Sequence, residues 1–492
     1  MTIPSLASVD DRFMRFCWFS LPPSARALIL SRASKTTWVF GAGASHHYNL
    51  NRFGVSVPLA SGFFKAFNEL PTSQGFGAHI GPLISFLEHY RGVAPDRVAT
   101  WDENIENFMT SIESKLEELR AKKKKRRFSA NDFGDFVSYS TVFNNMNFIF
   151  ANVLNESQNG ASTSLYHMLI ETCGPNDSFI TFNWDTLLDR ALTDSGGWTP
   201  QDGYGVSFAS VLEGTWKKKI SGKPQYKTNW RLLKLHGSTN WLVPYLGVHF
   251  QTLKYVSIVP KSDRVFLYWY SSLPYLTHHG RWRGGYVPAC YGYYPPNIPG
   301  KLFNKAEISA GPGRIFSSFT PRLFSPFEER SDQGVPSSPL LITPVRQKKY
   351  DMYASTIGSL WKQAAASLET ADKMVIVGYS FPPTDVRTMR LVRDALSKRR
   401  ADIELEIVAP GVKEILGRIG GETLSLAKKV TPFDMTFEQY LEHAGSRIPG
   451  MMRKAAAQSK EVHDWIMMLL GLSLTTVEQR GAMHRATRGR KR

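Results

Sequence analysis

Residues 36–45 are Thr-Thr-Trp-Val-Phe-Gly-Ala-Gly-Ala-Ser, an apolar, β-rich run that ends in two glycines. A strand that stops in glycines and leads into a helix is typical of the start of a nucleotide-binding α/β domain. Glycine lets the backbone approach a pyrophosphate, and the N–H groups of the helix attract the anion. The third glycine of the fingerprint GxGxxG would fall at His46, so a plain glycine turn is the alternative.

Strands and helices alternate along the rest of the chain. The run Lys373–Val377 is almost wholly apolar, which is typical of a strand buried on both faces of a parallel sheet. The alternation predicts the α/β class, with a Rossmann-like parallel sheet flanked by helices and a helical layer after the first strand. We predict further strands at 178–182, 232–235, 340–343 and 403–408, and helices at 82–92, 102–127, 135–156, 185–192, 350–369, 384–399 and 434–471.

A middle stretch, residues 243–338, is rich in Tyr, Trp, Phe, Gly and Pro. Its Pro and Gly density argues against regular helices, so we predict an irregular or β-rich insertion, after which residues 340–343 resume the parallel sheet. The predicted organisation is an N-terminal extension at 1–35, a nucleotide-binding domain at 36–440 with a helical insertion at about 80–175, a C-terminal helical segment at 441–473 and a basic tail at 474–492.

Composition restricts the class of protein. The three cysteines are far apart and form no CxxC pair, and no apolar run reaches the ~20 residues of a membrane helix, so we expect a cytoplasmic protein without disulfides, metal or membrane contact. The net charge of +18 raises the expectation of an anionic partner, including nucleic acid. Two basic stretches, 122–127 and 480–492, contribute to it. A solvated helix end and a disordered tail are the alternatives.

Polar side chains follow two of the predicted strands. Asn183 and Asp185 come directly after the strand at 178–182; Asn183 can donate and accept, which suits ribose hydroxyls or a carboxamide. Either residue could instead cap the next helix. His236 follows the strand at 232–235 and is a suitable base near neutral pH, with a buried structural histidine as the alternative.

A fourth turn follows the strand at 373–377. Gly378 and Ser380 could contact a phosphate or a ribose, whereas a turn with Asp385 as helix cap is the alternative. The carboxyl ends of parallel strands meet at one edge of a sheet, so all four turns are expected to converge on one crevice.

In this order, the motifs resemble the sirtuin-like superfamily, specifically its divergent bacterial branch found in defence systems against phage. They are GAGAS at 41–45, TFNWDTLL at 181–188, KLHGSTNW at 234–241 and GYSFPPTD at 378–385; Asn104-Ile-Glu106 also looks like that branch. The resemblance covers about residues 36–440. It implies that Gly41, Ala42, Gly43 and Ser45 contact the NAD phosphates and the adjacent ribose, and that Gly378 and Ser380 contact the adenosine half. It also implies that Asn183 lies at the nicotinamide ribose, that His236 is the base facing that ribose, and that Asp185 lies near the carboxamide.

The chain departs from the protein-deacylating sirtuins. It lacks their two zinc-binding CxxC pairs, and Gly54-Val-Ser-Val-Pro-Leu59 replaces their GIPDFR-like stretch. We therefore predict an NAD hydrolase that releases nicotinamide and ADP-ribose. Bond breaking has oxocarbenium character and needs no metal, because the pyridinium leaves readily. Asn183 would position the ribose and a water, and His236 would take a proton or polarise that water.

An unregulated NAD hydrolase would drain the cell. We therefore expect a regulated effector of anti-phage defence by abortive infection, activated by a protein partner, by homo-oligomerisation or by nucleic acid bound through the basic tail. Two alternatives stay open: an NAD-dependent deacylase or ADP-ribosyltransferase, and a non-catalytic module that senses NAD or ADP-ribose within a larger complex.

Overall fold

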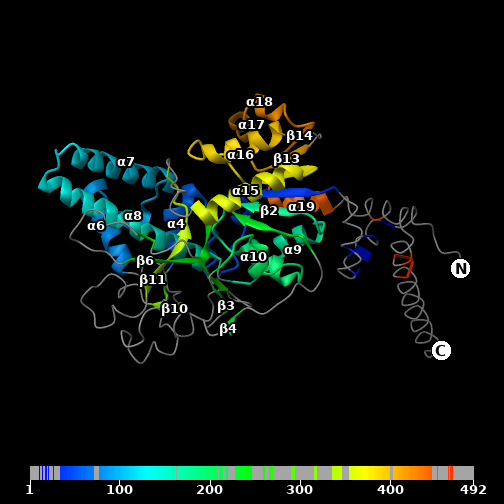
Figure 1. Ribbon diagram of the computed structural model, residues 1–492, viewed down its shortest axis with the longest axis horizontal. Coiled ribbons are helices and arrows are strands. Elements are labelled where there is room, and N and C mark those ends of the chain that lie inside the picture. The colour runs from blue at the N-terminus through cyan, green and yellow to red at the C-terminus, as the bar shows by residue number, and fades with distance from the viewer. Residues whose placement is uncertain are drawn as a thin grey trace, which may run out of the picture.

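The computed structural model describes most of residues 34–246, short strands between 259 and 318, residues 335–345, 354–398 and 403–445, and isolated positions nearer either end (Figure 1). Two hydrophobic cores lie within these residues. One surrounds a parallel sheet, and the other fills a layer of helices beside it. No helix of the described residues is long and apolar enough to cross a membrane.

The parallel sheet has the order β14-β13-β12-β1-β2-β5 among its described strands. In chain order, β2 and β5 step outward from β1 on one side, and β12, β13 and β14 step outward on the other. This is the order of doubly wound dinucleotide-binding sheets, and the predicted fold class is confirmed. The strands are β1 (Thr36–Phe40), β2 (Ser178–Thr181), β5 (Leu232–Lys234), β12 (Lys373–Val377), β13 (Glu404–Val408) and β14 (Lys429–Phe433).

Both faces of β1 are covered, and all its residues, Thr36 and Thr37 included, are buried. Phe40 packs against Tyr166 and Phe437, so helices α9 (Ser164–Glu171) and α19 (Phe437–Gly445) lie on one face. On the other face the Thr37 hydroxyl donates to the Ser367 carbonyl of α15 at 3.2 Å. Further flanking helices are α10 (Leu187–Asp194), α15 (Ala354–Thr370), α16 (Val386–Ser397), α17 (Val412–Ile419) and α18 (Gly421–Leu424).

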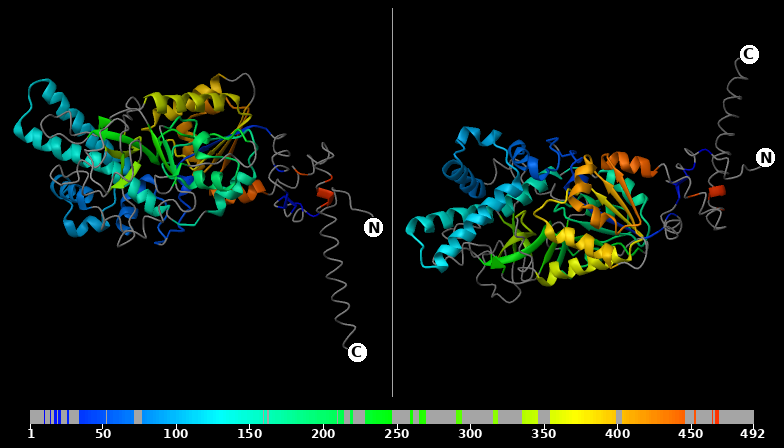
Figure 2. Two further views of the ribbon diagram at one scale, coloured as in Figure 1. Left: turned by 60° about the horizontal axis from the view of Figure 1, so that its bottom comes forward. Right: turned by 90° about the horizontal axis from the view of Figure 1, so that it is seen from above.

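The helical layer follows β1, as predicted. Asn104 caps α7 by accepting from the Glu106 N–H at 2.9 Å, and Ser129 forms a capping box with Asp132 at the start of α8. Helices α7 and α8 run side by side and project away from the sheet in both orientations of Figure 2. The layer comprises α4 (Phe63–Glu69), α6 (Gly77–Arg91), α7 (Ile105–Lys124) and α8 (Ala130–Ser157).

A second sheet contains strands of the aromatic-rich insertion, and it corrects one prediction. Residues 340–343 do not resume the parallel sheet: strand β11 (Val335–Leu341) pairs antiparallel with β6 (Gly237–Leu246). Strand β6 follows β5 directly in the chain and belongs to the second sheet. When the chain returns from the insertion, β11 pairs with β6 and not with β5. The other strands of this sheet are β3 (Ser210–Glu213), β4 (Lys218–Lys219), β7 (Val259–Pro260), β8 (Phe266–Trp269), β9 (Cys290–Tyr293) and β10 (Ile315–Ser318).

Most of residues 243–338 lies outside the described residues, as do most of the predicted extension at 1–35 and the predicted tail at 474–492. The helix predicted at 434–471 is seen as α19, and its part beyond 445 lies mostly outside the described residues.

Candidate functional site

The four polar turns meet at one cavity of about 690 Å³. It lies where the strand order changes direction, between β1 and β12, and its walls reach from the end of β13 to the end of β5. Its volume is within the range of about 300–1,000 Å³ that holds small molecules and cofactors. Apart from Gly41 and Ser45, all the predicted site residues line it: Ala42, Gly43, Asn183, Asp185, His236, Gly378 and Ser380.

The glycines of the first and fourth turns pack against each other. The Gly43 N–H donates to the Gly378 carbonyl at 3.0 Å, and a Cβ on Gly41 would lie 2.5 Å from the Tyr379 Cα. Gly378 has φ +60°, and a Cβ there would lie 2.3 Å from the Ala44 nitrogen. The two turns therefore require glycine for their own contact. A role of these residues in phosphate binding stays a prediction.

Helix α3 (Ala42–Ser45), which follows the first strand, is a single turn. The N–H groups of Gly41, Gly43 and Ala44 already donate to backbone carbonyls. Among the described residues no carbonyl accepts from the Ala42 N–H, which leaves this group for a ligand. The sequence predicted that N–H groups at the start of this helix attract an anion. Of the four N–H groups from Gly41 to Ala44, only that of Ala42 has no backbone acceptor among the described residues.

Asn183 does not cap the following helix. Its Nδ2 donates to the Gly41 carbonyl at 2.9 Å and to Ser45 Oγ at 3.2 Å, and Ser45 in turn bonds the buried Tyr166 hydroxyl at 2.9 Å. Burial raises the pKa of Tyr166 well above its ordinary value, so this phenol stays protonated. Because the Gly41 carbonyl can only accept, the amide is oriented, and among the described residues nothing donates to Asn183 Oδ1.

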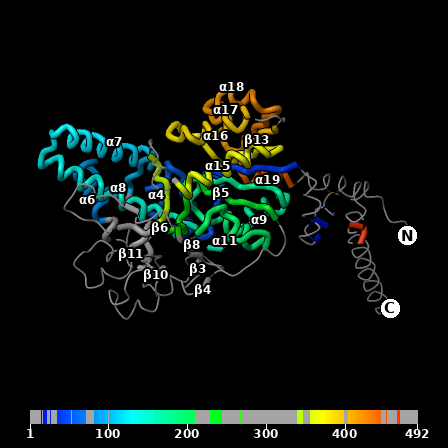
Figure 3. Tube along the Cα trace, in the orientation of Figure 1, coloured from blue at the N-terminus to red at the C-terminus, as the bar shows by residue number. Residues whose placement is uncertain are grey.

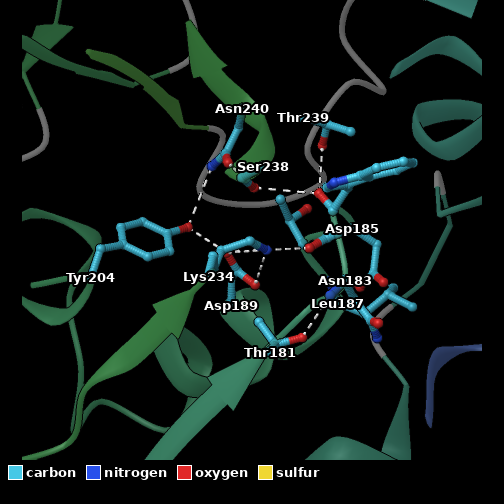
Figure 4. A network of polar contacts seen from close by, with 12 residues as sticks. Thr181, Asn183, Asp185, Leu187, Asp189, Tyr204, Lys234, Ser238, Thr239 and Asn240 are labelled. Carbon is cyan, nitrogen blue, oxygen red and sulfur yellow. Dashed lines mark hydrogen bonds and ion pairs between the residues drawn. The ribbon is translucent and has the colours of Figure 1, made fainter. Parts of the chain in front are cut away.

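Asp185 lies one residue before Thr186, the N-cap of α10, and its Oδ1 accepts from the Leu187 N–H at 3.1 Å. Its carbonyl accepts from Lys234 Nζ, and Lys234 also pairs with the buried Asp189 at 3.2 Å (Figure 4). Burial raises the pKa of Asp189, and Lys234 opposes this shift. A buried ion pair therefore stabilises the turn that contains Asn183 and Asp185.

His236 is joined to a carboxylate from the fourth turn. Its Nε2 lies 3.3 Å from Asp385 Oδ2, and that oxygen also accepts from the Tyr379 hydroxyl at 2.7 Å. Asp385 is almost fully buried and caps α16 by accepting from the Thr388 N–H at 3.3 Å. The imidazole lies 5.0 Å from the Phe182 ring. Sequence reasoning treated Asp385 as a cap; the structure shows a cap that also holds the candidate base.

The residues after His236 are structural. Gly237 has φ +81°, and a Cβ there would lie 1.9 Å from the Leu340 carbonyl oxygen, so the chain of β11, not a ligand, makes the close approach. The Thr239 N–H donates to the Trp184 carbonyl at 3.0 Å, and the Trp184 indole N–H donates to the His236 carbonyl at 3.0 Å. These bonds hold the second and third turns together.

The outer walls come from segments that the sequence did not assign to the site. Glu106 and its neighbours from the start of α7 face the fourth turn, and the Thr384 hydroxyl donates to Glu106 Oε2 at 3.0 Å. His47 lies beside α3, and burial lowers its pKa while its bond to the Ala44 carbonyl opposes the shift. Other wall residues are Val57, Pro58, Leu59, Asn104, Ile105, Ala409, Pro410, Thr436 and Glu438.

No three His, Cys, Asp or Glu side chains of the described residues are grouped as a metal site requires.

No protein-family model and no curated protein matches the chain. Solved structures that resemble it are Sir2 proteins. A mutant Sir2 homologue with ADP-ribose is 10% identical, with 89% of this chain and 99% of that chain covered and a TM-score of 0.29. A Sir2 homologue–NAD complex is 10% identical, covering 87% and 93%, with a TM-score of 0.28. A structure on the mechanism and regulation of Sir2 enzymes is 11% identical, covering 88% and 100%, with a TM-score of 0.33.

Proposed function

We propose that this protein hydrolyses NAD to nicotinamide and ADP-ribose. The observation that carries the proposal is that Asn183, His236 and two interlocked glycine turns, from four neighbouring parallel strands, line one cavity. Dinucleotides bind to doubly wound sheets across this switch of strand direction. The cavity also runs along the strand ends, as an elongated substrate requires. The motif order GAGAS, TFNWDTLL, KLHGSTNW and GYSFPPTD supports the same substrate.

Asn183 would orient the ribose and the attacking water. Both bonds of its Nδ2 go to the protein, so Oδ1 is the atom that can accept from a ribose hydroxyl or from a water. An acceptor fixed in this way turns the oxygen lone pair of the water toward the anomeric carbon. Its contribution is positioning, which pays part of the entropy of the reaction before the bond breaks.

His236 would accept the proton of that water. With a proton on Nε2 facing Asp385, the neutral ring carries its lone pair on Nδ1. When Nδ1 gains a proton, the buried Asp385 carboxylate stabilises the positive charge of the ring. The nicotinamide leaves as a neutral base, so no acid is needed on that side of the bond.

The setting that we propose is the bacterial cytoplasm, with the enzyme as a regulated, NAD-depleting effector of defence against phage. Its support is the resemblance of the motif order to that branch. Constant hydrolysis of NAD would harm the cell that makes the enzyme, so activity is proposed to depend on a protein partner, an oligomer or a nucleic acid.

The test is chromatography of the products after the purified protein is incubated with NAD, alone and with nucleic acid. We expect nicotinamide and ADP-ribose in equal amounts, and a loss of about 100-fold or more in Asn183→Ala and in His236→Ala. Asn229→Ala is the matched control. Asn229 is exposed and lies before the amino end of β5, whereas the cavity lies at the carboxyl ends of the strands.

The products also separate the alternatives. With an acylated protein present, acylated ADP-ribose or ADP-ribosylated protein would replace hydrolysis by group transfer. Tight NAD binding without release of nicotinamide under any of these conditions would refute hydrolysis and leave a sensing module.

A further inference from the structure

A strongly basic turn joins the end of α7 to the start of α8 at the far end of the helical layer (Figures 1 and 3). We call residues 122–127, Lys-Lys-Lys-Lys-Arg-Arg, the hairpin tip. Only Lys122 is half-buried and paired, with Glu118 at 3.2 Å and Asp132 at 2.9 Å. Residues 123–127 are all exposed, and none of them forms an ion pair within the described part of the chain. The tip therefore presents five uncompensated positive charges in consecutive positions.

The backbone of the hairpin tip makes this sequence unfavourable. The Arg126 N–H donates to the Lys123 carbonyl at 3.0 Å and the Arg127 N–H to the Lys122 carbonyl at 2.9 Å, which is the Schellman pattern of helix ends. In that pattern the residue at Arg126 is left-handed, and here φ is +55°. Glycine normally occupies this position because a Cβ is strained there. The chain places an arginine at a site where glycine would be more stable.

The helix dipole does not account for the hairpin tip. Cations are favoured in the last turn of a helix, which explains Lys122 to Lys124, but the effect falls off beyond that turn. Arg126 and Arg127 lie past the end of α7. Like charges three and four residues apart also repel. Strain and repulsion together are local costs of the kind that sequences keep at functional sites.

We propose that the hairpin tip binds the phosphate backbone of a nucleic acid. A phosphodiester chain offers the dense, regular negative charge that matches five neighbouring cations, and the +18 net charge of the protein favours the same partner. Phe133, in the first turn of α8, is 45% exposed. This exposed ring, in the helix that follows the hairpin tip, offers a stacking surface for a base, which an acidic protein surface would not use. This proposal does not depend on the chemistry of the cavity.

The test measures fluorescence anisotropy of labelled single-stranded and duplex DNA and RNA with the full chain, between about 50 and 200 mM salt. The tip variant is Lys124→Gln/Arg126→Gly/Arg127→Gln. It is expected to bind at least about tenfold more weakly than the wild type, and to lower the slope of log K against log salt by about 2–3. Glycine relieves the strain at residue 126, so the melting temperature is not expected to fall.

The control variant removes the same charge elsewhere: Arg390→Gln/Lys398→Gln/Lys429→Gln changes three exposed residues around the parallel sheet. It is expected to bind like the wild type. The proposal is overturned if the wild type does not bind at the lowest salt, or if the tip variant binds no more weakly than the control. Equal competition by polyglutamate would overturn the assignment to nucleic acid.

Discussion

Asp385→Asn tests the site most directly, because one carboxylate joins the candidate base to the fold. Asp385 Oδ2 lies 3.3 Å from His236 Nε2 and 2.7 Å from the Tyr379 hydroxyl, and Oδ1 lies 3.3 Å from the Thr388 nitrogen. Asparagine keeps the shape and one acceptor but loses the negative charge. A hydrogen bond to a charged group contributes about 1.5–3 kcal/mol, so kcat is expected to fall about 10- to 150-fold.

The assay is nicotinamide release over a range of NAD concentrations, which separates kcat from KM. The charge acts when the imidazole gains a proton, so KM is expected to stay within about twofold. Ser129→Ala is the control, because Ser129 also caps a helix, accepting from the Asp132 N–H at 3.1 Å, but lies outside the cavity. Ser129→Ala should lose about 1 kcal/mol of stability from its cap, whereas asparagine at 385 is still a good capping residue. If Asp385→Asn keeps the kcat of the wild type, as Ser129→Ala should, Asp385 is a cap alone and the reasoning is refuted.

Three further predictions concern the supports of the site and of the sheet. Gly378→Ala is expected to lower the free energy of unfolding by more than about 2 kcal/mol, because a Cβ at φ +60° meets the backbone of the first turn. Gly417→Ala, in an open position within α17, should stabilise slightly; equal melting temperatures would contradict the interlocked turns. Lys234→Met leaves the charge of Asp189 buried and should cost about 3–5 kcal/mol in denaturant unfolding, whereas a cost below about 1 kcal/mol would show that the pair supports nothing. Burial raises the pKa of Asp177 from 3.8 to about 7, so the folded chain binds a proton that the unfolded chain has lost between these values. The free energy of unfolding should therefore fall by up to about 4 kcal/mol as the pH rises through this window, and Asp177→Asn, followed by denaturant titration, should remove that part of the slope.

The central strands were predictable because burial on two faces leaves an unmistakable apolar run. Residues 374–377 and 38–40 show it, and the polar turns after them fall where the sheet requires. The strand β14, which sequence reasoning missed, lies at the edge of the sheet, has only Phe433 buried, and contains Pro432. An edge strand has neither the apolar pattern nor the full set of N–H donors that identify a central one.

Pairing between distant segments was beyond local patterns. Leu340 and Leu341 read as a strand, but nothing in their sequence says that their neighbour is β6 and not the parallel sheet. The contact of His236 with Asp385 joins two turns far apart in the chain. Each residue taken alone therefore had a structural explanation as good as a functional one. The glycines of the first and fourth turns pack against each other's backbone, and the glycine fingerprint of the first turn does not predict that contact.

The interlocked turns also bear on how the protein is made. The first turn and Asn183 leave the ribosome early, whereas Gly378 and Asp385 follow only after the helical layer and the second sheet have been synthesised. Until β12 emerges, β1 has an open edge where its partner will pair. A nascent chain at that stage has only part of the cavity wall and no carboxylate of Asp385 beside His236. Translation itself therefore delays the assembly of the cavity until β12 and the turn after it have been synthesised.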